Sequence, residues 1–288
     1  MQRNWAKYNE QLVKRGEFYL CLDFLGDNHA ELLKMNKQKL GRPFAYADSF
    51  IRFTAFLRVA FSLEYRQTEG VLRALSKHIP KLDCADYTTL WRRSTKLTLN
   101  MPESTKDPDR VVIIDGTGIK TTNRGDWRSV FYERRKNWLK VNIAIDEKTG
   151  ELLGIDIAPR PQHDSKSFEN VIRDVSMSVL KGDGAFDKKS IFNYCHDNGI
   201  TPVIKIRKSS IKRSRGSLLR KKCVIELNEL EEEAWKRKYE YGKRWLVESY
   251  FSAVKRSYGE AVKSRRSDMM VKEAMIKFLL YATVRQIA

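Results

Sequence analysis

The sequence predicts an α/β protein in which an all-helical N-terminal region precedes a domain built on a mixed β-sheet. Up to about Asn100 the apolar residues recur with helical spacing. A polar segment bracketed by Pro102 and Pro108 interrupts this pattern, and beyond it short β-branched runs alternate with helical stretches. We therefore expect a helical region over residues 1–101 and a second domain over residues 109–288.

Three helices are predicted in the first region. Asp48 is a suitable N-cap for the first, whose broad apolar face leaves Arg58 on the outside. The other two span residues 64–78 and 87–97, and Asp86 is the N-cap candidate of the last. Their connection is longer than the usual turn of a helix-turn-helix, so a helical bundle is favoured and a groove-reading module stays an alternative.

The second domain is predicted to alternate strands and helices in the order β-β-β-α-β-α-β, followed by a terminal helix. This order is shared by ribonuclease-H-like domains, so we expect a mixed sheet flanked by helices. The expected segments are strands at Val111–Ile114, Leu139–Ile145 and Leu152–Ile157, a helix from Asp164 to about Val179, a strand ending near Asp183, a helix over Lys188–Asn198 and a strand over Thr201–Ile206.

The charge of the chain favours a polyanionic partner. Lysine and arginine number 55 against 36 acidic residues, a net charge of +19, while 42% hydrophobic residues suffice for a packed core. Nucleic acids and anionic membrane surfaces are the common extended polyanions, and no apolar stretch approaches the roughly 20 residues that span a bilayer. Residues 205–222 hold nine basic and no acidic residues, which predicts a mobile or DNA-ordered basic loop.

Cysteine and histidine spacing argues against a zinc site or a disulfide framework. The four cysteines contain no C-x-x-C pair, and the four histidines show neither H-x3-H nor H-E-x-x-H spacing. A reducing compartment is therefore expected, and any metal ion would have to bind oxygen ligands.

Two acidic residues follow predicted strands. Asp115 comes directly after the apolar run Val111–Ile114 and is followed by Gly116, while Asp183 stands between two glycines. Acids at the ends of different strands can converge at one edge of a sheet. A pair of ordinary Asp-Gly turns is the alternative.

A third segment carries polar residues in a helical stripe. Tyr241, Arg244, Glu248 and Lys255 fall within an arc of roughly 60° on one helix at about 100° per residue. An ordinary exposed i, i+4 ion pair between Arg244 and Glu248 would also explain part of this pattern.

The stripe fits Y-x2-R-x3-E-x6-K without a gap, and the chain resembles the DDE transposases of prokaryotic (archaeal and bacterial) insertion sequences. Asp115 and Asp183, each within its glycine-containing motif, match the first two acids of that family. The likeness also covers residues 65–70, 87–93 and 123–127, so it extends over nearly the whole chain.

The resemblance implies a ribonuclease-H-like catalytic domain over 109–288 and a DNA-binding or dimerisation region over 1–101. Three carboxylates, those of Asp115, Asp183 and Glu248, would hold two Mg²⁺ or Mn²⁺ ions, because divalent cations relieve their mutual repulsion. Two such ions can activate a water or a DNA 3′-hydroxyl and stabilise the departing oxygen. The remaining stripe residues would contact DNA phosphates; they are Tyr241, Arg244 and Lys255.

The expected activity is phosphodiester hydrolysis at the ends of an insertion sequence, followed by strand transfer into target DNA. The expected partners are double-stranded terminal repeats and target DNA, bound by a homodimer on paired ends in the nucleoid-associated cytoplasm of a prokaryotic cell. A catalytically inactive or domesticated DNA-binding derivative is the alternative. Phosphotransferases with similar Asp-Gly motifs are disfavoured, since Ile113 stands where a dehalogenase-type enzyme needs a second aspartate.

Overall fold

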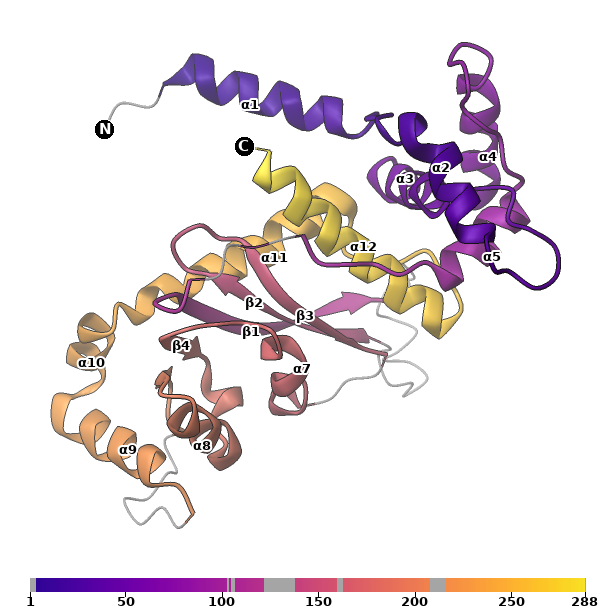
Figure 1. The fold of residues 1–288 in the computed structure, drawn as a ribbon. Helices are drawn as coiled ribbons and strands as arrows, with labels where there is room; N and C mark the ends of the chain where they lie inside the picture. Colours follow the sequence, from indigo (N-terminus) through magenta and orange to yellow (C-terminus); the bar gives the residue numbers. More distant parts are fainter. Residues whose placement is uncertain are drawn as a thin grey trace, which may run out of the picture. The chain divides into compact units, whose positions relative to one another are not determined.

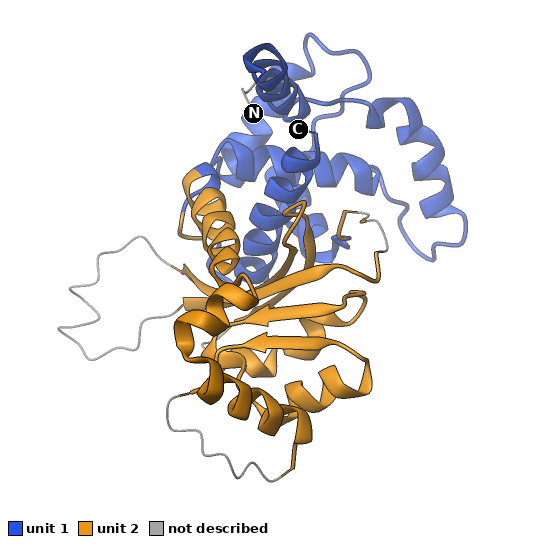
Figure 2. Ribbon diagram, turned by 90° about the vertical axis from the view of Figure 1, so that its left-hand side faces the viewer, with its two compact units in different colours: residues 1–100, 257–259, 263–288 blue, residues 101–256, 260–262 orange. Residues whose placement is uncertain are grey.

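The computed structural model describes residues 4–102, 104, 107–121, 138–159, 163–207 and 216–287. The chain divides into two compact units, shown in different colours in Figure 2. Unit 1 comprises residues 1–100, 257–259 and 263–288, and unit 2 comprises residues 101–256 and 260–262. The division near residue 100 lies beside the predicted boundary, whereas the C-terminal segment, predicted as part of the second domain, belongs to unit 1.

Unit 1 is helical (Figure 1). The N-cap prediction for Asp86 is confirmed, because its carboxylate accepts the backbone N–H groups of Thr88 and Thr89. Asp48 is instead the first helical residue, and its carboxylate pairs with Arg93 at 2.6 Å.

No helix among the described residues is long and apolar enough to cross a membrane. The helices are α1 (Trp5–Phe18), α2 (Phe24–Asn36), α3 (Asp48–Ala60), α4 (Tyr65–Leu75), α5 (Tyr87–Lys96) and α12 (Ser267–Gln286).

Arg58 of α3 is buried, so its predicted outward orientation is wrong. Its guanidinium lies 2.9 Å from the carboxylate of Glu273 on α12, and both side chains are about 5% exposed or less. It also lies over the ring of Tyr65, 4.6 Å from the centroid. The reason is that α12, which the sequence analysis placed in the other domain, packs with α3 and supplies the buried counter-charge.

Unit 2 contains a five-stranded sheet in the order β3-β2-β1-β4-β5. The first three strands in sequence pair antiparallel, and β4 and β5 extend the sheet in parallel from β1. This order and these directions are those of a ribonuclease-H-like core, so the predicted fold class is confirmed. The strands are β1 (Val111–Lys120), β2 (Trp138–Asp146), β3 (Leu152–Ala158), β4 (Val179–Gly182) and β5 (Thr201–Ile204).

Helices cover both faces of this sheet. Val112 and Ile114 of β1 face a core built with two helices, α7 and α8. Because side chains alternate along a strand, Asp115 and Thr117 face the other way, where Arg244 of η3 contacts Asp115 and Lys255 of α11 contacts Thr117. The helical segments are η1 (Asp164–Lys166), α7 (Phe168–Ile172), η2 (Gly184–Phe186), α8 (Lys189–Asp197), α9 (Leu218–Leu230), α10 (Glu232–Lys238), η3 (Tyr241–Arg244) and α11 (Trp245–Tyr258).

Two predicted segments differ from the structure. The helix expected from Asp164 to about Val179 is limited to η1 and α7, because the chain then turns to bring Ser178 against the carbonyl of Arg110 and to start β4. The predicted basic loop 205–222 ends earlier, since α9 begins at Leu218. Residues 208–215 of that loop lie outside the described residues.

Candidate active site

Asp115 and Asp183 lie side by side at one edge of the β1–β4 pair. Ile114 and Gly182 are register partners in parallel strands, and each is followed directly by one of the two acids. The alternative of two ordinary turns is wrong for Asp115, because β1 continues through it to Lys120 while pairing with β2. Asp183 does begin a turn, and its carboxylate accepts the N–H of Ala185 at 2.9 Å.

Arg244 links the first of these acids to the helix that carries the third. Its Nη1 donates to Oδ2 of Asp115 at 2.6 Å, and its Nη2 donates to Oε1 of Glu248 at 2.5 Å. The i, i+4 ion pair is therefore present, but the same guanidinium also reaches β1. The predicted single helix is divided, because Tyr241–Arg244 forms the 3-10 turn η3 and α11 starts at Trp245.

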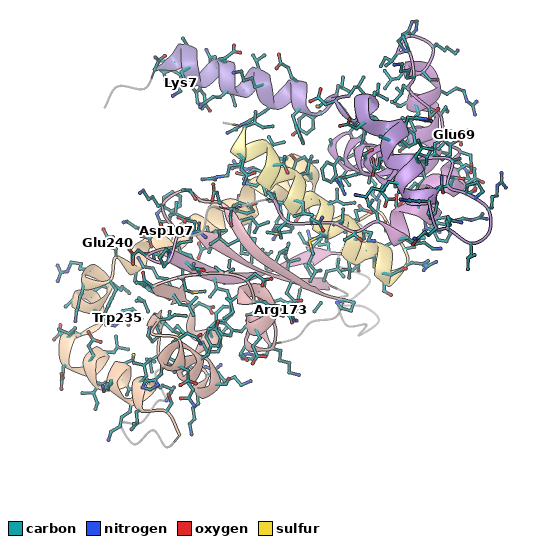
Figure 3. The ribbon with its side chains drawn as sticks, in the orientation of Figure 1. Lys7, Glu69, Asp107, Arg173, Trp235 and Glu240 are labelled. Carbon is teal, nitrogen blue, oxygen red and sulfur yellow. The ribbon has the colours of Figure 1, made fainter. Side chains whose placement is uncertain are left out.

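The other two residues of the stripe, Tyr241 and Lys255, contact the strands that carry or precede the two aspartates, β4 and β1. Tyr241 is buried and its hydroxyl donates to the carbonyl oxygen of Gly182 at 3.1 Å. Its ring packs against that of Trp235 on α10, with centroids 5.1 Å apart, and Figure 3 labels Trp235. The ammonium of Lys255 donates to Oγ1 of Thr117 on β1 at 2.8 Å. The stripe thus lies along one side of the sheet beside the two aspartates.

Burial dominates the electrostatics of this site. The pKa of Asp115 is raised because desolvation and the nearby Asp183 outweigh the N–H of Gly116 and the charge of Arg244. Burial also raises the pKa of Tyr241 to about 12, so its hydroxyl stays protonated at neutral pH and can donate. The pKa of Lys255 is lowered, mainly by desolvation.

A buried ion pair that the sequence analysis missed supports this edge of the sheet. Lys181 of β4 lies 2.5 Å from the carboxylate of Glu147, which also pairs with Lys243 of η3 at 3.3 Å. The Lys181 ammonium also donates to the carbonyl of Glu240, labelled in Figure 3, at 3.4 Å. The only indication of this ion pair in the sequence is Lys181 itself, a charged residue inside an otherwise apolar strand. Its partners Glu147 and Glu240 lie in turns that are distant in the sequence.

A second missed interaction holds the turn that follows Asp183. The side chain of Asp187 is almost fully buried and accepts two bonds from Arg220 on α9, at 2.6 and 2.8 Å. It also accepts the backbone N–H of Arg207 at 3.1 Å. These bonds depress the pKa of Asp187 against the effect of burial. Residues near both ends of the predicted basic loop, Arg207 and Arg220, are therefore bonded to the turn that follows the second acid.

The carboxylate donors have the chemistry that a hard divalent cation requires, since all are oxygen ligands. As placed, no three acidic, histidine or cysteine side chains among the described residues are gathered closely enough to hold a metal ion. A cation already lies between Asp115 and Glu248, namely the guanidinium of Arg244. The stretch Asn123–Trp127, which contributed to the family resemblance, lies outside the described residues.

Comparison with known families agrees with this geometry. A family model described as a transposase DDE domain matches residues 106–283, and a second model with the same description matches residues 13–124. The first match spans more than half of the chain and includes all six residues of the predicted site. The chain therefore belongs to the DDE transposase family.

Two solved structures show distant likeness. One is a chain of the Drosophila P element transposase strand transfer complex, with 11% identity and a TM-score of 0.35, covering 93% of this chain and 70% of that one. The other is a chain of the simian T-cell lymphotropic virus intasome in complex with PP2A regulatory subunit B56 gamma, with 13% identity, a TM-score of 0.26 and 64% of this chain covered. The match spans 66% of that chain, just under two thirds of its length.

Proposed function

We propose that this chain is the transposase of a prokaryotic insertion sequence, which cuts double-stranded DNA at the ends of its element and joins the freed ends to target DNA. The observation that carries this proposal is the adjacency of Asp115 and Asp183 on neighbouring parallel strands, together with the link from Arg244 to Glu248. Membership of the DDE transposase family supports the same assignment.

Asp115, Asp183 and Glu248 would hold two Mg²⁺ or Mn²⁺ ions. When bound, such ions supply activation of the attacking oxygen and stabilisation of the departing oxygen. Asp115 is well suited to a ligand role, because a partly desolvated carboxylate gains most from a strong counter-charge. No protein side chain is then needed as a nucleophile.

The cations beside the acids would bind the DNA backbone. Lys255 is held by Thr117 at a position next to Asp115 along β1, and Arg244 has the planar fork that grips a phosphate with two bonds. By family resemblance Tyr241 would contact phosphate as well, and the bond from its hydroxyl to the carbonyl oxygen of Gly182 would fix η3 beside β4. By family resemblance the working form is a homodimer on paired DNA ends.

The direct test is Mg²⁺-dependent cleavage of a plasmid that carries DNA from both sides of the gene. We expect nicks at the boundaries of the element, and none in a plasmid of equal length with unrelated sequence. Binding of the flanking DNA without cleavage, in Mg²⁺ and in Mn²⁺, would contradict the enzyme assignment. It would favour the alternative of an inactive DNA-binding derivative.

A further inference from the structure

Arg244 lies between two of the three side chains that we propose as metal ligands. Its two terminal nitrogens donate to different carboxylates, one on Asp115 and one on Glu248. One planar guanidinium therefore bridges two acids that come from separate elements, β1 and α11, and its single positive charge offsets only part of their combined charge. A divalent ion that bound the same two carboxylate oxygens would have to displace the Arg244 guanidinium from them.

We propose that Arg244 is a positioning residue that stands in for the metal ion in the metal-free protein. It holds Asp115 and Glu248 together and leaves this position when a divalent cation binds, after which its guanidinium is free to grip a DNA phosphate. This inference rests on the proposed function, because it assumes that these carboxylates are metal ligands.

The surroundings of Arg244 allow its side chain to move while the backbone stays in place. The turn η3 is attached to β4 by the Tyr241 hydroxyl on Gly182 and by the Lys181 ammonium on the carbonyl of Glu240, and neither bond involves the guanidinium. The side chain of Arg244 is 22% exposed and that of Glu248 is 56% exposed. Solvent and ions can therefore reach the bridge without unfolding of the sheet.

The charges of the site also favour replacement of the Arg244 guanidinium by a divalent metal ion. With Arg244 withdrawn, Asp115 would lose its nearest counter-charge while remaining close enough to Asp183 to be repelled by it. A divalent ion removes this repulsion more completely than a single positive charge does. The metal ion and Arg244 therefore compete for the same carboxylates.

The experiment is a calorimetric titration of metal-free protein with Mn²⁺ at pH 8, comparing wild type with Arg244→Gln. We expect the variant to bind Mn²⁺ about tenfold more tightly, because the competing cation is gone. Lys243→Gln is the matched control: it removes one charge from the same turn, but Lys243 pairs with Glu147 and Glu240 instead of the site acids. Its affinity should stay within about twofold of wild type. Equal or weaker Mn²⁺ binding by Arg244→Gln overturns the proposal.

Asp183→Asn separates this failure from failure of the proposed function. If wild type binds Mn²⁺, and Asp183→Asn loses it, but Arg244→Gln gains nothing, only the stand-in role is wrong. If neither wild type nor Arg244→Gln binds Mn²⁺, both proposals are wrong.

A measurement on the wild-type protein keeps the test valid if Arg244→Gln does not fold. With ¹⁵N-labelled arginine, the Arg244 guanidinium signals, assigned by comparison with Arg244→Lys, should change when Mg²⁺ is added. Signals that keep their positions at saturating Mg²⁺ would overturn the proposal.

Discussion

At the scale of single residues, Asp115 combines burial with charge. Only 13% of its side chain is exposed, and its pKa is raised despite the nearby guanidinium. A carboxyl group with a higher pKa in the folded state holds its proton more tightly there, so its ionisation disfavours folding as pH rises through that range. Replacing the carboxyl group of Asp115 by an uncharged amide should therefore remove this cost.

We expect Asp115→Asn to be as stable as wild type or more stable at pH 7.5, and inactive in cleavage. The stability difference should shrink as the pH falls through the raised pKa, because the wild-type carboxyl group then becomes neutral as well. Thermal unfolding of both proteins from pH 8 down to about pH 4, near the ordinary pKa of an aspartate, measures this. A large loss of stability at pH 7.5 would instead identify Asp115 as a structural residue whose charge the fold requires.

At the scale of elements, the close approach of α7 to β3 depends on Gly154. A Cβ atom at this position would lie 1.8 Å from the carbonyl oxygen of Val171, a backbone atom that cannot move without shifting the helix. Gly154→Ala should therefore lower the free energy of unfolding by about 2 kcal/mol or more. Urea unfolding measures the effect.

Gly70→Ala is the matched control for this substitution. Gly70 is an exposed residue of α4, and a Cβ atom there would meet nothing within 4 Å. Alanine should stabilise the helix by about 0.5–1 kcal/mol. Equal effects of the two substitutions would show that helix α7 is not in contact with β3 in solution as described.

The elements that sequence predicted best are those that depend on local pattern. Three of them are confirmed: the β-branched run before Asp115, the alternation in β2 and β3, and the N-cap Asp86. Each of these signals depends only on residues that are close together in the sequence. The length of β1 was missed because glycines at 116 and 118 are typical of turns, whereas pairing with β2 keeps them in the strand.

The site was predicted in part for a similar reason. Adjacent parallel strands end at the same edge of a sheet, and the residues that follow them meet there. The convergence of Asp115 and Asp183 therefore follows from the parallel pairing of β1 with β4. The contacts of Arg58 could not be predicted, because its partner Glu273 lies 215 positions later in the chain. The second bond of Arg244 likewise depends on where α11 packs on the sheet, which no spacing within the stripe specifies.

At the scale of the whole molecule, the net charge of +19 predicts how DNA binding responds to salt. Neutralising phosphates releases counterions, so the affinity for duplex DNA should fall by about a thousandfold between 50 and 200 mM salt if roughly six phosphates are contacted. Fluorescence anisotropy with a labelled element end measures this slope. Affinity that changes little with salt would contradict a binding mode based on the excess of lysine and arginine.

The central claim is that three acids from β1, the end of β4 and α11 form one centre for DNA cleavage. Its most direct test is single-turnover nicking of element-end DNA in Mg²⁺ by Asp115→Asn, Asp183→Asn and Glu248→Gln, with binding of the same DNA measured in parallel. We expect each variant to bind the DNA with near wild-type affinity and to leave it uncut. Cleavage at the wild-type rate by any one of them would remove that residue from the centre and contradict the claim.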